Sequence, residues 1–149
     1  MYLKPLYLTP ELEFFSADSQ YSLELELYQS SVSAGFPSPA DDYVDVKLDL
    51  NKYLIKHPSA TFYVRVKGNS MINANIHDGD LLIVDKSKIP QNNDIAICVI
   101  DGDFTVKRLK MQGDDIFLIP ENPDYQPIKV VDGNNFQVWG VVSYIIHKT

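Results

Sequence analysis

The sequence predicts a mainly β fold, built of antiparallel strands with one short helix and preceded by a flexible N-terminal arm. Three observations lead to this prediction. Seven segments beyond residue 60 are rich in β-branched and aromatic residues and are separated by turn residues. An Asp-Gly pair between two of them is typical of a tight hairpin. A stretch rich in Ser, Ala, Gly and Pro follows residue 28, and its Pro37 and Pro39 exclude a regular helix there.

The elements follow in order along the chain. In Tyr21–Tyr28, leucines alternate with serine and glutamate, which predicts a strand with one buried face. The linker at residues 29–40 is expected to be exposed. Asp49 can cap a short helix over residues 50–56, which His57-Pro58 ends. The strands beyond this helix are expected at residues 61–66, 81–84, 95–100, 104–111, 116–119, 128–131 and 136–146.

The distribution of charge divides the chain. The 149 residues carry a net charge of -7, which argues against a protein that holds nucleic acid through a basic face of its own. Residues 1–34 contain one lysine against five acidic residues, so this quarter of the chain carries -4. We therefore expect three parts: a distinct arm at residues 1–34, a linker at 35–40 and a β domain at 41–149.

Several classes of protein are excluded by composition. The apolar runs fall short of the roughly 20 residues that a membrane helix needs, and the first residues do not form a secretion signal. The single cysteine, Cys98, excludes an internal disulfide framework and indicates a reducing cytoplasm. The histidines, His57, His77 and His147, are too far apart to suggest a metal site. Because no phosphate-binding loop occurs either, we expect a cytoplasmic protein without metal or cofactor.

Ser70 is the first candidate for chemistry. It follows Gly68 at the end of the strand expected at residues 61–66, where a turn can expose a hydroxyl and leave backbone N–H groups free. A Ser-His-Asp triad is disfavoured, because the segment around Ser70 lacks the second glycine of a nucleophile elbow.

Lys107 is the second candidate. It lies in the second strand of the Asp101-Gly102 hairpin, and period-two alternation places it on one face with Thr105, Leu109 and Met111. Desolvation on that face would lower the pKa of the amine and let it act as a neutral base. On spacing alone, a lysine with a purely structural role is the more common outcome.

Short blocks spread over residues 34–149 carry a family resemblance. They read AGFPSPADDYVDVKLDLNKYLIKHPSATFYV, GNSM, IHDGDLLIVD, DGDFTVKRL, LIPENPDYQPI and WGVV, in this order. Together they closely resemble the peptidase domain of the LexA and UmuD family. The resemblance implies a curved, strand-rich LexA/signal-peptidase-like fold. It also implies that Ser70 is a nucleophile, that Lys107 is its general base, and that the bond cut is Ala34-Gly35 in the chain's own linker.

The chemistry of that bond follows from this assignment. We expect the backbone N–H groups of Ser70 and Asn69 to hold the oxyanion, as is general for acyl transfer at an exposed turn. Ala34 and Gly35 have almost no side-chain bulk, and Val32 points to the same side of an extended segment as Ala34, so it can fill an apolar pocket. On composition alone, this segment is an ordinary flexible hinge.

The resemblance also implies a biological role. It predicts an SOS mutagenesis protein, stimulated to cut itself by a RecA filament on single-stranded DNA. The cut form then serves as a homodimeric accessory subunit of an error-prone translesion DNA polymerase. A LexA-like repressor is an alternative, but it needs a basic DNA-binding domain, which residues 1–34, with a net charge of -4, cannot supply. A catalytically idle interaction module of the same fold is the other alternative. No sequence-specific DNA binding and no membrane attachment are expected.

Overall fold

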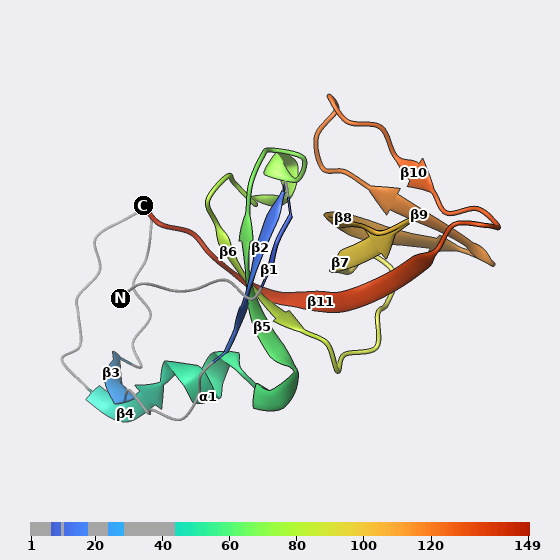
Figure 1. Ribbon diagram of the computed structural model, residues 1–149. Helices are drawn as coiled ribbons and strands as arrows, with labels where there is room; N and C mark the ends of the chain where they lie inside the picture. Colours follow the sequence, from blue (N-terminus) through green and yellow to red (C-terminus); the bar gives the residue numbers. More distant parts are fainter. Residues whose placement is uncertain (1–6, 10, 18–23, 29–43) are drawn as a thin grey trace. The chain divides into compact units, whose positions relative to one another are not determined.

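The computed structural model in Figure 1 describes residues 7–9, 11–17, 24–28 and 44–149. Contacts between residues divide the chain into two units. One consists of Met1–Ala17 with His57–Thr149, and the other of Asp18–Lys56. The linker expected at residues 29–40 lies outside the described residues.

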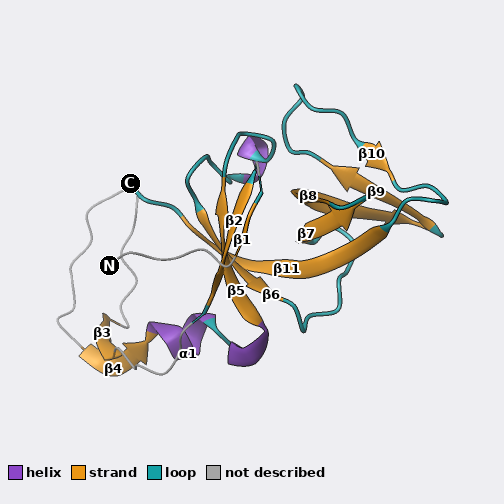
Figure 2. Cartoon of the chain, in the orientation of Figure 1, coloured by secondary structure: helices purple, strands orange, loops and turns teal. Residues whose placement is uncertain are grey.

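The larger unit contains one nine-stranded sheet in the order β1-β2-β5-β6-β11-β7-β8-β9-β10. Every neighbouring pair in it is antiparallel, which confirms the predicted mainly β, antiparallel fold. Figure 2 shows how far strands outweigh helices. The strands are β1 (Tyr7–Leu8), β2 (Leu12–Ser16), β5 (Thr61–Val66), β6 (Leu81–Asp85), β7 (Ile95–Ile100), β8 (Asp103–Gln112), β9 (Asp115–Ile119), β10 (Ile128–Lys129) and β11 (Phe136–Ile146).

The long strand β11 joins the two halves of this sheet (Figure 1). Its first part pairs with β7 and its second part pairs with β6, and the register shifts once within each pairing. Such irregularities bend a strand and increase its twist. One of them includes Gly140, where an added Cβ would lie 2.6 Å from Val84 Cγ1 in the core. The bend therefore requires a residue without a side chain.

The hairpin between β7 and β8 forms as predicted. Ile100 pairs with Asp103, so the turn consists of the two residues Asp101 and Gly102. Both have positive φ, 51° and 86°, as this type of turn requires. The other strands expected beyond residue 60 are also confirmed, although the strand expected at residues 128–131 ends at Lys129.

The smaller unit pairs β3 (Glu24–Tyr28) with β4 (Val44–Asp49) and continues into α1 (Leu50–Leu54). The Asp49 carboxylate accepts a hydrogen bond from Asn51 N at 3.0 Å, which confirms the predicted cap. The helix ends two residues earlier than expected, because Ile55 is already extended. Together with the 3-10 turns η1 (Pro58–Ala60) and η2 (Ile72–Ala74), α1 completes the helical residues described, and none of these helices is long enough to cross a membrane.

The N-terminal strands β1 and β2 dock on the larger unit, whereas the division of the chain at residues 34 and 40 stays a prediction. β2 pairs with β5 over five residue pairs, and Leu12 and Phe14 are completely buried. Strict alternation misses this strand because Phe14 and Phe15 are adjacent apolar residues and both are buried. The contacts thus group residues 11–17 with the main sheet, while the cut at Ala34-Gly35 remains a prediction.

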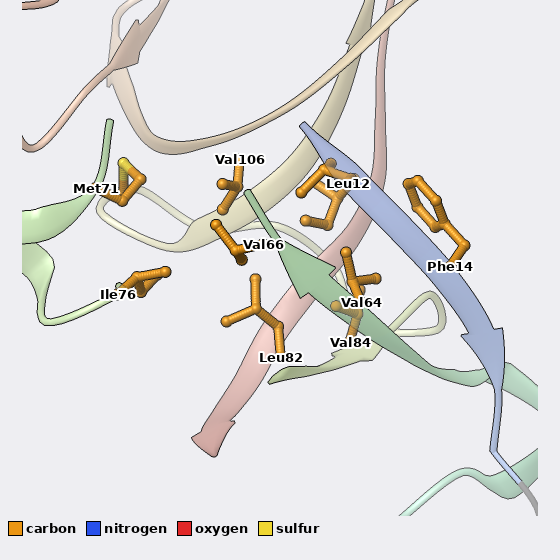
Figure 3. Close-up of a cluster of buried hydrophobic side chains, with 10 residues drawn as sticks. Leu12, Phe14, Val64, Val66, Met71, Ile76, Leu82, Val84 and Val106 are labelled. Carbon is orange, nitrogen blue, oxygen red and sulfur yellow. The ribbon is translucent and has the colours of Figure 1, made fainter. Parts of the chain in front are cut away.

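Two clusters of buried side chains fill the larger unit. In the first, shown in Figure 3, side chains of β2, β5, β6 and β8 meet Met71 and Ile76. The Phe14 ring packs edge-on against Phe104 and Trp139, with centroids 5.0 and 4.9 Å away. Members of the first cluster are Leu12, Phe14, Val64, Val66, Met71, Ile76, Leu82, Val84, Ile97 and Val106. The second cluster consists of Ala96, Cys98, Leu109 and Leu118.

We expect Phe14→Ala to lower the free energy of unfolding by about 3 kcal/mol, because it removes a fully buried ring and leaves a cavity. Urea unfolding of the full chain measures this change. Ile89→Ala is the control, since that side chain is 84% exposed and its loss is expected to change stability by less than about 0.5 kcal/mol. Equal stability of the two variants would show that β2 contributes nothing to the core.

Candidate active site

Ser70 and Lys107 lie next to each other. Their separation in sequence is 37 residues, yet Lys107 Nζ donates a hydrogen bond to Ser70 Oγ at 3.3 Å. Ser70 comes from the loop after β5 and Lys107 from the middle of β8. The structure thus brings together the two side chains that residue type and local context had selected separately.

The loop that carries Ser70 is fixed at both of its ends. Gly68 has a φ of 94°, a left-handed conformation that favours glycine, and its N–H donates to Asp78 Oδ1 at 2.7 Å. On the other side, Met71 is buried in the first core cluster. The side-chain amide of Asn122 donates to the carbonyl of Asn69 at 2.8 Å. These contacts fix the position of the half-buried Ser70 hydroxyl, although Ser70 lies in no helix or strand.

Lys107 is a buried amine with three hydrogen-bond partners. Only 5% of the residue is exposed. In addition to Ser70 Oγ, its Nζ donates to Thr105 Oγ1 at 2.6 Å and to the Val106 carbonyl at 3.1 Å. Thr105 and Leu109 are buried on the same face of β8, as alternation predicted. A lysine here is therefore enclosed rather than directed into solvent.

Burial lowers the pKa of Lys107, because the charged ammonium loses its hydration. The negative charge of Glu11, and that of an ionised Cys98, act in the opposite direction. Burial also raises the pKa of the Cys98 thiol to about 12, so the thiol is neutral wherever an enclosed lysine titrates. Glu11 is thus the negative charge that raises the pKa of Lys107.

The three partners suit both forms of the amine. An ammonium group has three N–H donors, and all three partners offer an oxygen that accepts. A neutral amine has two N–H donors and one lone pair. It can keep its bonds to Thr105 and Val106 and turn the lone pair toward the Ser70 hydroxyl, which is the geometry that a general base needs.

A cleft of about 590 Å³ opens beside Lys107. Three parts of the chain line it: the segment before β2, the β7–β8 hairpin and the segment that leads into β10. Ser70 itself is not part of the lining. The lining residues are Leu8, Thr9, Glu11, Ile100, Gly102, Asp103, Phe104, Thr105, Lys107, Tyr125, Gln126 and Ile128.

The other predicted site residues divide into two groups. Asn69 is exposed beside Ser70, and within the part of the chain that is described neither backbone N–H has an acceptor. Val32, Ala34 and Gly35 lie outside the described residues. In the described ranges, no three His, Cys, Asp or Glu side chains are placed to hold a metal ion.

Two residues of the site were not identified from the sequence. Thr105 was placed on the face of Lys107 but given no role, although its hydroxyl makes the shortest contact to Nζ. Glu11 was counted only as part of the acidic arm. The position of Thr105, two residues before Lys107 on the same strand face, indicates that the two side chains can meet. No sequence pattern links Glu11 to the distant strand β8.

Comparisons with known proteins show the family of the chain. Residues 26–143 match the family described as peptidase S24-like. Protein SamA of Salmonella typhimurium strain LT2 is 47% identical over 123 residues, covering 83% of this chain and 85% of that protein. Protein MucA of Escherichia coli is 40% identical over 133 residues, covering 88% and 90%.

A repressor is also similar over a shorter stretch. The LexA repressor of Erwinia tasmaniensis is 44% identical over 99 residues, which cover 66% of this chain and 48% of that protein. The family match spans most of the described β sheet, including Ser70 and Lys107. The chain therefore belongs to the peptidase S24-like family, which confirms the resemblance to LexA and UmuD proteins.

Proposed function

We propose that this protein is a serine endopeptidase that cuts its own chain between Ala34 and Gly35. Ser70 is the nucleophile and Lys107 is the general base. The observation that carries the proposal is the 3.3 Å contact between the serine hydroxyl and a buried lysine whose pKa is lowered by desolvation. Membership of the peptidase S24-like family supports the same chemistry.

The reaction has two stages. Neutral Lys107 takes the Ser70 proton while Oγ attacks the Ala34 carbonyl, and the resulting ammonium gives that proton to the Gly35 amine as the peptide bond breaks. Water, deprotonated by the same amine, then attacks the acyl carbonyl, and the ammonium returns that proton to Ser70 Oγ as the acyl–oxygen bond breaks. The N–H groups of Ser70 and Asn69 hold the oxyanion that forms in each stage.

The substrate segment binds as an extended strand next to Lys107. Small residues at Ala34 and Gly35 let the carbonyl reach a half-buried hydroxyl. Val32 enters an apolar part of the cleft, for which the side chains of Ile100, Phe104 and Ile128 are available. Because the segment is tethered to the enzyme, its effective concentration is high and the rate depends on how often it enters the cleft.

The biological role proposed for the protein is SOS mutagenesis. A RecA filament on single-stranded DNA stimulates the cut, and the product, residues 35–149, acts in the cytoplasm as a homodimeric accessory subunit of an error-prone DNA polymerase. This role rests on the resemblance to UmuD proteins. The similarity to SamA and MucA, which covers 85% and 90% of those proteins, favours this role over that of a LexA-like repressor, of which it covers 48%.

Replacement of the nucleophile is the first test. We expect purified full-length protein to yield a fragment that begins at Gly35, and we expect Ser70→Ala to reduce the cutting rate at least about a thousandfold. Mass spectrometry measures both fragments over time, with and without RecA filaments. Ser143→Ala is the matched control and is expected to cut normally. An intact wild-type chain under all these conditions would contradict the proposal and favour the catalytically idle module.

The dependence of the cut on pH is the second test. Lys107 must be neutral to act as a base, and it is neutral only above its pKa. We therefore expect the rate to rise with pH to a plateau, with its midpoint below 10.5, the ordinary lysine pKa, because burial lowers the pKa in the folded protein. Initial rates of fragment formation across this range measure the profile. A rate that falls as the pH rises would exclude Lys107 as the base.

A further inference from the structure

The segment before β2 forms one wall of the cleft beside Lys107. Leu8, Thr9 and Glu11 line this cleft together with Thr105 and Lys107. All of these residues belong to the same compact unit. A part of the chain that precedes the proposed cleavage site thus already lies next to the proposed base.

Glu11 is held in this place by its neighbours on both sides. Its carbonyl accepts a hydrogen bond from Lys67 N at 2.7 Å, next to the end of β5. On the N-terminal side, the Thr9 hydroxyl accepts from Leu12 N at 3.0 Å. The following residue, Leu12, is fully buried, and Glu13 forms an ion pair with Lys67 at 2.9 Å. The backbone at Glu11 is therefore tied to the sheet.

The side chain of Glu11 reaches Lys107 through Thr105. The Thr105 hydroxyl donates to Glu11 Oε2 at 3.4 Å and accepts from Lys107 Nζ at 2.6 Å. A hydroxyl has only one proton. When that proton points to the carboxylate, the oxygen of Thr105 can only accept from the amine. Both forms of Lys107 can donate to this oxygen, but the negative charge of the Glu11 carboxylate, one hydroxyl group away, favours the ammonium.

We propose that Glu11 is a positioning residue that slows self-cleavage, because its carboxylate binds the Thr105 hydroxyl and so favours the charged, inactive form of Lys107. The inference rests on the proposed function of Ser70 and Lys107. It adds a residue of the N-terminal segment that controls when the base is available. Glu11 itself touches no reacting atom.

The other charges near Lys107 do not replace this effect. Cys98 on β7 is neutral, because its pKa is raised to about 12. Asp103 lines the same cleft at the start of β8, but the electrostatic contributions that shift the pKa of Lys107 come from Glu11 and Cys98. Burial lowers the pKa of the lysine and the Glu11 carboxylate raises it. Loss of this one carboxylate is thus expected to make the amine neutral at a lower pH.

Glu11→Gln tests the inference in the full-length chain. The amide has nearly the same shape and can still accept from Thr105, but it has no charge. We expect self-cleavage at pH 7 to be about threefold faster than in the wild type, as suits a solvent-exposed carboxylate that acts on a buried amine. The rate profile is expected to move to lower pH with the same plateau, because Lys107 is fully neutral at the plateau in both proteins.

Glu13→Gln is the matched control for the change in net charge. It removes one negative charge two residues further along the chain, in β2, but the partner of Glu13 is Lys67 and not Thr105. We expect its rate profile to overlay that of the wild type. The inference is overturned if the rate profile of Glu11→Gln overlays that of the wild type. It is also overturned if Glu13→Gln moves the profile as far as Glu11→Gln does.

A second measurement needs no cleavage. In a Ser70→Ala background, the 13C signal of the Lys107 side chain is followed by NMR during a pH titration. We expect Glu11→Gln to move the midpoint to lower pH and Glu13→Gln to leave it in place. If Glu11→Gln moves the midpoint but the wild-type chain never cuts itself, the contact between Glu11 and Lys107 through Thr105 is supported and the proposed function is refuted. An unmoved midpoint in a protein that cuts normally would refute the role of Glu11 alone.

Discussion

The enclosure of a single amine is the constraint on which the site depends. Lys107 is 5% exposed, so its charged form loses most of its hydration and depends on neighbouring oxygens and on the charge of Glu11. Those oxygens come from its own strand, at Thr105 and Val106, and from Ser70 in a distant loop. Burial of a lysine amine lowers the stability of the folded protein. This loss serves a function if the neutral amine acts as a base. The catalytic interpretation explains why the fold retains it.

The strand β8 contributes to both core clusters and carries the proposed base. Val106 packs in the first buried cluster, whereas Leu109 belongs to the second, so both faces of the strand are covered. On the other side of the contact, Met71 anchors the Ser70 loop in the same cluster as Val106. The residues adjacent to the two candidates therefore share one packed interior. Because close-packed interiors resist small displacements, the 3.3 Å contact is fixed by the core and not by the loop alone.

The sequence predicted local structure well and contacts between distant segments poorly. Runs of β-branched residues gave most strands, and Asp101-Gly102 gave the hairpin, because both signals are local. Ser70 and Lys107 were selected by residue type, but their contact depends on the strand order between β5 and β8, which no spacing encodes. β2 was missed because its partner is remote and its alternation is broken at Phe15. Thr105 was placed on the correct face, yet its role depends on a hydroxyl contact that a pattern cannot show.

The N-terminal segment links stability to control of the reaction. Leu12 and Phe14 contribute to the core, while Leu8 and Glu11 line the cleft. Short strands near the edge of a sheet open locally at a lower free energy than the whole domain. Opening of β1 and β2 would remove the Glu11 carboxylate and one wall of the cleft in the same step, without unfolding β8. In the proposed reaction the substrate is tethered, so access to the cleft and the charge of Lys107 would set the rate, and this segment would affect both.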